Sequence, residues 1–307
     1  MIFDLTPKDF ANMFSTDVNN FCEDTLLEIE KNDFRYRKMT VRERDKTILK
    51  VIKQIDSEDL GVAGSSSIKK WENGWNENLV EFVNEGYNFK KLTPKYYRPY
   101  QIARIFGDFA IPLSPTFDID FLSVLRLWLF KKYFASFDNI YEFGCGPAHN
   151  IAFLSKLFPK KYIHGSDWAS SSVDIIKTLK TELGMNVDGC KFDMFNPDPN
   201  LKLKKNSVVF TMGSMEQLGD NYAKFVDFLV KNSIDLCIHV EPICEFYNEN
   251  ILLDYLAVKY HQKRKYLSNY MSYLESRSDI EIVNRNRVFA GSFYEEGWSI
   301  IVWKLNR

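Results

Sequence analysis

The sequence predicts an α/β fold with a largely parallel sheet, and three observations in its second half carry that prediction. From about residue 137 onward, short apolar segments that suit buried strands alternate with segments whose apolar residues recur at helical spacing. A Gly-rich turn at 144–146 follows the first of these strands. Acidic residues, Asp167 and Asp193, end the next two strands. Because strands and helices alternate, we expect helices on both faces of the sheet.

The first predicted strand covers residues 139–143 and leads into the Gly-rich turn. Gly144 and Gly146 let the backbone turn tightly and pass close to a ligand, and a helix is expected to begin at Ala148. A strand, a glycine turn and a helix N-terminus together point free backbone N–H groups at the negative end of a ligand. Glycine turns also follow many strands for steric reasons alone, so this turn does not by itself establish a binding site.

A second strand is predicted over residues 161–168, about 20 residues beyond the glycines. Asp167 at its end can accept hydrogen bonds from both hydroxyls of a ribose. The helix that follows, over 173–183, is expected to stop at Gly184.

The third strand, over residues 187–195, again ends in an acid, Asp193. Trp168 and Met194 stand beside the two acids and provide bulky apolar side chains. This combination would hold a nucleoside, with one acid on the ribose, the other on the adenine amino group, and apolar walls on the ring.

These segments resemble, in order and spacing, motifs of the class I S-adenosylmethionine-dependent methyltransferases. Residues 142–146, Asp167 and 192–194 resemble the first three motifs, 207–213 and 236–242 the fourth and fifth strands, and 280–290 with 299–304 the closing antiparallel pair. The resemblance covers about residues 137–307, and no motif upstream is recognised. Ala148 stands where the family often has a third glycine.

The resemblance implies a Rossmann-like, seven-stranded, mostly parallel sheet with a closing antiparallel strand, preceded by a mostly helical N-terminal region. Residues 1–136 would then be a lid or substrate-recognition region, and residues 137–307 the domain that binds S-adenosylmethionine. The cofactor residues it implies are Glu142, Gly144, Gly146, Asn150, Asp167, Trp168, Asp193, Met194 and Met212.

The N-terminal region is expected to contain helices over residues 1–60, where the charge run 35–46 is most simply a solvated helix face. Residues 61–67 are small and indicate a linker or mobile loop. Trp71 and Trp75 are four residues apart and share a helix face, which favours core packing over a substrate platform.

Arg98 lies among three tyrosines and a proline just before the second half of the chain. In the resembling enzymes, residues at this place fold over the cofactor and contact its carboxylate. An arginine suits a carboxylate by charge and bidentate geometry. An exposed arginine beside packed tyrosines is an equally good interpretation.

Methyl transfer depends mainly on positioning, and a base helps when the acceptor atom must lose a proton. The candidates are Glu216 in the loop after the fourth strand, Glu241 at the end of the fifth, His149 beside the glycine turn and His261 on a long helix over 250–274. Glu216 is the best of these, because that loop faces both cofactor and acceptor in resembling enzymes. Glu241 could simply cap the next element, and His239, inside a strand, is expected to be a core histidine.

Composition limits the class of protein. The 307 residues allow one catalytic domain with an extension. A formal net charge of −1 argues against a nucleic-acid partner, which usually binds a strongly basic face. No group of His, Cys, Asp or Glu has the spacing of metal ligands, so no metal is expected.

The five cysteines form no CxxC pair, which favours a reducing, cytoplasmic location. Residues 1–10 lack the basic start and apolar run of a signal peptide. The apolar segment 121–130 is too short to span a bilayer, so no membrane span is expected. The sequence leaves a homodimer open.

The sequence favours a small-molecule methyltransferase that acts on a hydroxyl of a sugar or similar polyhydroxylated acceptor. The aromatic-rich N-terminal region could stack against a sugar ring. A protein or RNA methyltransferase is an alternative within the same chemistry. Nicotinamide dehydrogenases share the glycine turn and the acid after the second strand, but Asp193 and the closing pair have no place in them. A catalytically silent, cofactor-binding scaffold is a third class.

Overall fold

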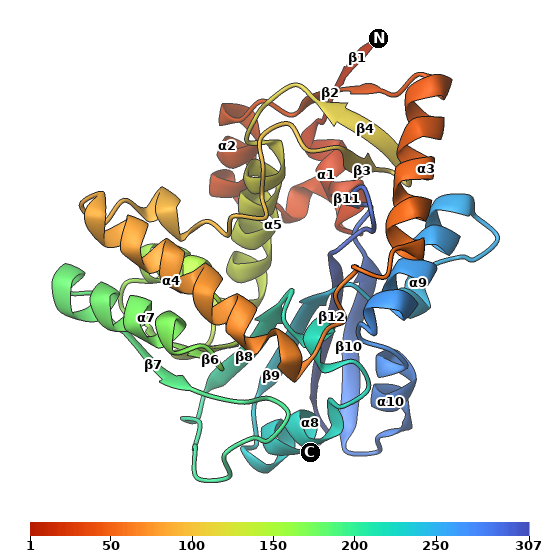
Figure 1. Ribbon diagram of the computed structural model, residues 1–307. Helices are drawn as coiled ribbons and strands as arrows, with labels where there is room; N and C mark the ends of the chain where they lie inside the picture. Colours follow the sequence, from red (N-terminus) through yellow and green to blue (C-terminus); the bar gives the residue numbers. More distant parts are fainter. Residues whose placement is uncertain (307) are drawn as a thin grey trace.

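A computed structural model describes residues 1–306 and contains, within them, two sheets (Figure 1). The larger is a seven-stranded sheet with the order β10-β12-β9-β8-β5-β6-β7. Its strands are β5 Asn139–Phe143, β6 Tyr162–Asp167, β7 Val187–Lys191, β8 Ser207–Met212, β9 Leu236–Glu241, β10 Ile280–Arg287 and β12 Ser299–Leu305. Five strands are parallel, β12 is antiparallel to β9, and β10 is antiparallel to β12. The predicted fold class is confirmed.

The strand order reverses at β5, and this positions the site. From β5 the chain proceeds outward through β6 and β7, then crosses back to add β8 and β9 on the other side. The central strands β8 and β9 are buried almost throughout, as expected for parallel strands covered on both faces. In such sheets the ligand crevice lies beyond the carboxyl ends of the strands at the reversal, here those of β5 and β8.

Helices cover the large sheet on both faces, and one of them differs from the prediction. They are α5 Phe117–Phe134, α6 His149–Leu157, α7 Ser170–Leu183, α8 Ala223–Lys231, α9 Leu252–Arg264 and α10 Tyr270–Ser276. Helix α7 ends at Gly184 in a left-handed conformation, as predicted. The single helix predicted over 250–274 is wrong, because Lys265 and Asn269 adopt left-handed backbone and divide it. Leu267 between them is fully buried, so the apolar pattern continues across the break.

The N-terminal region is mostly helical, as predicted, and also contains strands that the sequence did not reveal. Its main helices are α1 Pro7–Met13, α2 Glu23–Lys31, α3 Val41–Asp56 and α4 Ile68–Asn84. Its strands are β1 Ile2–Asp4, β2 Arg35–Lys38, β3 Ala103–Ile105 and β4 Asp108–Pro112, which form the second sheet with β11 Ala290–Ser292 in the order β1-β2-β4-β3-β11. The helical interpretation of the charge run 35–46 therefore fails over its first four residues. These strands are three to five residues long, too short for a clear alternation of apolar and polar side chains.

The two halves of the chain share one core. Phe130 and Phe134 of α5 contact Phe210 of β8, with ring centroids 5.4 and 5.1 Å apart. Strand β11, from the C-terminal part, pairs with β3 of the N-terminal part. The predicted boundary at 136/137 thus marks where the large sheet begins, while apolar packing continues across it. Among residues 1–306, no helix combines the length and the apolar character that crossing a membrane requires.

Candidate active site

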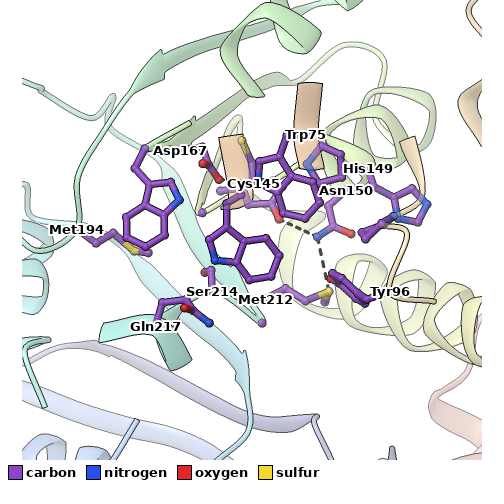
Figure 2. A pocket seen from close by; sticks show the side chains of 18 of the residues that line it. Trp75, Tyr96, Cys145, His149, Asn150, Asp167, Met194, Met212, Ser214 and Gln217 are labelled. Carbon is purple, nitrogen blue, oxygen red and sulfur yellow. Dashed lines mark hydrogen bonds between the residues drawn. The ribbon is translucent and has the colours of Figure 1, made fainter. Parts of the chain in front are cut away.

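A pocket opens over the carboxyl ends of β5, β6 and β8, and we call it the strand-end pocket (Figure 2). Its lining includes eight of the ten cofactor residues predicted from the sequence: Glu142, Gly144, Gly146, Asn150, Asp167, Trp168, Met194 and Met212. The remaining two, Asp193 and Arg98, are not among its lining residues within the described chain.

The glycine turn forms the floor of the strand-end pocket. Gly144 has φ +73°, and a Cβ there would come within 2.6 Å of Ser214 Oγ and closer still to Ser214 Cβ. Gly146 has φ +52° and faces the Trp75 ring. Ala148, in place of the family's third glycine, also has left-handed backbone, at φ +56°, which costs an alanine about 1–2 kcal/mol. The turn therefore needs glycine at 144 both for its conformation and for its space.

Glu142 brings a buried carboxyl to this pocket from β5. Its Oε1 accepts a hydrogen bond of 2.7 Å from Asn150 Nδ2, while its Oε2 is buried and has no partner among residues 1–306. Burial raises the pKa of Glu142 to about 8. Arg126, which the sequence did not single out, donates to Asn150 Oδ1 at 3.1 Å and so fixes the amide that faces Glu142. An unpartnered buried carboxyl oxygen is costly, and a cationic or donor group on a ligand would satisfy it.

Asp167 ties the end of β6 to the glycine turn. Its Oδ2 accepts from the backbone N–H of Gly146 and its Oδ1 from that of Ala169, both at 2.8 Å. Burial raises the pKa of Asp167 to about 6, although these two hydrogen bonds act in the opposite direction. Each carboxylate oxygen can accept a further hydrogen bond, so the side chain remains able to bind hydroxyl groups.

An apolar slot lies next to Asp167. Trp168 and Phe195 stack with their ring centroids 6.1 Å apart and an interplanar angle of 14°, and Met194 lines the same pocket. Asp193 turns away from it, because its carboxylate accepts from Phe195 N at 2.9 Å and from Asn196 Nδ2 at 3.2 Å. The side chains that follow Asp193, rather than its own carboxylate, reach the strand-end pocket.

Helix α4 covers the pocket from the N-terminal region and lies across α7 (Figure 1). Trp71 and Trp75 stack with centroids 5.2 Å apart, and both line the pocket. Between them, the Glu72 carboxylate accepts from the backbone N–H groups of Ser170 at 2.6 Å and Ser171 at 2.9 Å. Since these are free N–H groups in the first turn of α7, Glu72 fastens helix α4 to the N-terminus of α7. Trp75 is buried, as the core interpretation predicted, but it is also part of the site.

Tyr96 and Tyr97 line the strand-end pocket, with ring centroids 4.8 Å apart. Arg98 does not follow them: its side chain is exposed and forms no hydrogen bond or ion pair within residues 1–306. The structure thus agrees with the alternative interpretation in the exposed arginine, whereas of the three tyrosines only Tyr97 is half-buried and Tyr96 and Tyr100 are exposed.

A second cavity of about 340 Å³, which we call the aromatic cavity, adjoins the first. Both are lined by Trp71, Tyr96, Tyr97, Gly213 and Trp298. The volume lies within the range of small-molecule sites. The two spaces therefore have a common wall at which ligands in each can meet.

Of the predicted catalytic residues, Glu216 alone lines the aromatic cavity. It belongs to a short 3₁₀ helix, Met215–Leu218, and its Oε1 accepts from the neighbouring Gln217 amide at 3.0 Å. Burial raises the pKa of Glu216 to about 8, and the charges of Glu295 and Glu241 act in the same direction. A carboxyl with such a pKa can accept a proton near neutral pH.

Glu241 and His261 lie outside both spaces. Glu241 is fully buried beneath the loop after β8, where its Oε1 accepts from Ser214 N at 3.2 Å. His261 is buried and ion-paired with Glu295; burial alone would lower its pKa, but the Glu295 charge outweighs it and raises the pKa to about 10. A charged, paired imidazole is a poor base, and a buried Glu241 cannot reach an acceptor. Neither residue lines the two spaces, and their catalytic roles stay predictions.

Two further histidines, His149 and His239, have clear surroundings. His149 lines the strand-end pocket, where burial and then the Arg126 charge hold its pKa well below the ordinary value. His239 is fully buried and bonded to Thr211 Oγ1 and Tyr270 OH, both at 2.8 Å, which confirms the core histidine. Within the described chain, no three His, Cys, Asp or Glu side chains are grouped to hold a metal ion.

Comparisons with known proteins support the fold. No protein-family model and no curated protein sequence matches the chain. Among solved structures, the [4+2]-cyclase SpnF is similar with a TM-score of 0.51 and 10% identity, over 79% of this chain and 96% of that one. The plantazolicin methyltransferase BpumL, solved with S-adenosylhomocysteine (SAH), has a TM-score of 0.44 and 13% identity over 79% and 98%. A S-adenosylmethionine-dependent methyltransferase from Aquifex aeolicus has a TM-score of 0.41 and 15% identity over 56% and 86%.

The fold is accordingly Rossmann-like, and the chain shares it with SpnF. At these identities the likeness extends to the fold, and the activity has to be argued from the site.

Proposed function

We propose that this protein transfers a methyl group from S-adenosylmethionine to a small-molecule acceptor. One observation carries the proposal: an unpartnered, buried carboxyl oxygen on Glu142 lies in the same pocket as the glycine turn and Asp167. S-adenosylmethionine carries an ammonium group, a ribose and an adenine, so it offers a partner to each part of that pocket.

Different residues of the pocket would bind different parts of the cofactor. Glu142 would hold the ammonium group and Asp167 the ribose hydroxyls, while Trp168, Met194 and Phe195 provide apolar contact for the adenine. When bound, the cofactor supplies an electrophilic methyl group on a sulfonium. Helix α4, through Trp71 and Trp75, excludes water from this pocket.

The acceptor would occupy the aromatic cavity, with Glu216 as the base that takes the proton it loses. A hydroxyl of a sugar or similar polyhydroxylated compound remains our first expectation for the reacting group. Two features support it: aromatic side chains that can stack on a ring, and a carboxyl whose pKa lies near neutral. Residues 1–136 would serve as lid and acceptor-recognition region for the cofactor domain 137–307.

Calorimetric titration of the full chain with S-adenosylmethionine, SAH and NAD tests the cofactor. We expect binding of the first two and none of NAD; the reverse pattern contradicts the proposal. Transfer of a labelled methyl group to a panel of hydroxyl and amine compounds then tests the reaction. Tight cofactor binding without transfer to any member would favour the silent scaffold, and transfer to a protein or RNA would favour those alternatives.

A further inference from the structure

The aromatic cavity has a chemical character of its own. Ten of its lining residues have aromatic side chains, including Tyr260 and Tyr294, which stack with centroids 4.6 Å apart. The faces of aromatic rings are partially negative and attract cations. Such walls favour a ligand that combines a flat ring with a positive charge.

Two carboxyl groups line this cavity without a cation to balance them. Asp118, at the start of α5, forms no hydrogen bond or ion pair with any residue of 1–306. Glu216 accepts only the amide of its neighbour Gln217, and its Oε2 receives no hydrogen bond in the described chain. Burial raises the pKa of Asp118 to about 7, so its ionised form is costly while the cavity holds no cation.

Arg104 is the only lysine, arginine or histidine among the described lining residues. Its side chain is 1% exposed, its Nη2 donates to the Tyr294 carbonyl at 2.9 Å, and its Nε and Nη1 are buried without a hydrogen-bond partner in the described chain. Burial lowers the pKa of Arg104, and the neighbouring Tyr247, Glu296 and Glu295 act in the opposite direction. An anionic ligand in the cavity would therefore meet two unpaired carboxyl groups and a single, almost fully buried positive group.

We propose that the acceptor carries a protonated amine beside a ring, with the ammonium group at Asp118 and the ring against the aromatic walls. This inference rests on the proposed function, because it names the substrate class for that site. The amine positions the methyl acceptor in the cavity. Glu216 remains the base that takes the proton from the reacting atom. An arylalkylamine and an amino sugar share this chemistry, and the experiment separates them.

The test uses ligands that differ in one group. Tyramine, 2-(4-hydroxyphenyl)ethanol and 4-hydroxyphenylacetate share a phenol ring and carry an amine, a hydroxyl and a carboxylate, while glucosamine and glucose form the sugar pair. Each is titrated into the full chain at pH 7, where both amines are mostly protonated, with and without saturating SAH. We expect at least one amine to bind about tenfold more tightly than its neutral counterpart, a difference of about 1.4 kcal/mol. The amine that binds identifies the ring class.

Two variants test whether Asp118 binds the ammonium group. Asp118→Asn should weaken amine binding about fivefold and leave the neutral analogue unchanged, since only the charge is removed. Asp120→Asn is the matched control: it lies two residues along α5, bonds to Thr116 and is not among the described cavity-lining residues. Thermal denaturation checks that both variants fold.

Three outcomes overturn the inference: tightest binding of the carboxylate, equal binding of each amine and its neutral analogue, or equal effects of the Asp118 and Asp120 variants. Failure of SAH to bind would instead contradict the proposed function. The titrations without SAH still decide the amine preference in that case, so the two failures are distinguishable.

Discussion

The strand-end pocket and the aromatic cavity share a wall, yet the chain builds them in opposite ways. The strand-end pocket is made chiefly by short segments, such as 142–150, 167–168 and 212–218, that each follow a strand of one sheet. The aromatic cavity joins residues 96–121 to residues 290–298, which are far apart in the sequence and meet where β3 pairs with β11. The first depends on local strand-to-helix turns, and the second on long-range packing.

The two spaces are alike in one respect, since each contains buried or half-buried carboxyl groups that form no ion pair in the described chain. Glu142 faces the strand-end pocket, and Asp118 and Glu216 face the aromatic cavity. Burial raises the pKa of all three. We therefore expect both spaces to bind positively charged ligands, and four variants test how far the two spaces differ.

The largest effect is expected at Gly144. In Gly144→Ala the new methyl group would collide with Ser214 and the backbone would be strained at φ +73°. We expect cofactor binding to fall about 100-fold or more, or about 2.7 kcal/mol, by calorimetry. Gly184→Ala is the control: it has a similar φ of +63° but no atom within 4 Å of the added Cβ. It should lose about 1 kcal/mol of stability from backbone strain and bind normally. Similar behaviour of the two variants would show that space at Gly144 is unimportant.

Gly144 illustrates what the sequence can predict. The chain order of a strand, its turn and the next helix sets the approximate positions of the residues in between. The glycines of the turn, the acid at the end of β6 and the apolar residues beside that acid could therefore be predicted. Asp193 does not line the strand-end pocket, because the direction of a side chain after a strand depends on local hydrogen bonds, here to Asn196. Glu241 and His261 line neither space, because burial under a loop and pairing with Glu295 are set by segments far away. The aromatic cavity was beyond prediction for the same reason.

The next largest expected effect is the dependence of cofactor affinity on pH, which we attribute to Glu142. Its pKa in the folded protein, about 8, lies above its ordinary value, so the ionised form is costly when folded. Its contribution to stability is present at low pH and is lost as pH rises toward 8. A cofactor ammonium needs the ionised form, so affinity should rise from pH 6 to 8, by up to about tenfold per unit, and then level off.

Glu142→Gln should bind weakly throughout and lose the rise in affinity between pH 7 and 8, while Asp167, whose pKa is about 6, leaves a smaller pH dependence at the acid end. Arg126, Asp167 and Glu241 also act on Glu142, and they are unchanged in the variant. Calorimetry between pH 6 and 9 in buffers of different ionisation enthalpy also counts the protons released. A wild-type profile that is flat over this range would exclude the ammonium contact.

Glu72 should give a smaller effect, because it acts on the cover and not on the cofactor. Glu72→Gln keeps the size but loses the charge that holds the N–H groups of Ser170 and Ser171, so we expect cofactor affinity to fall about threefold to tenfold. Limited proteolysis should cut residues 61–100 faster, and cofactor should protect them. Glu77→Gln, on the same helix and exposed beside Lys95, should change neither measurement. Equal results for both variants would mean that α4 is not held at α7.

The smallest effect is expected at Arg98, and it tests whether the cover rearranges. The exposed Arg98 makes no contact that Arg98→Ala would remove within the described chain, so S-adenosylmethionine and adenosine should each bind within about twofold of wild type, below 0.5 kcal/mol. Adenosine lacks the carboxylate that an arginine would bind, so a comparison of the two ligands shows whether Arg98 contacts that carboxylate. A selective loss of S-adenosylmethionine binding would show that the 95–101 segment moves onto the bound cofactor and brings Arg98 to its carboxylate. In that event, Arg98 would join Trp71, Trp75 and Trp298 as parts of the strand-end pocket that depend on long-range packing, and the contrast with the aromatic cavity would be reduced to the glycine turn and Asp167.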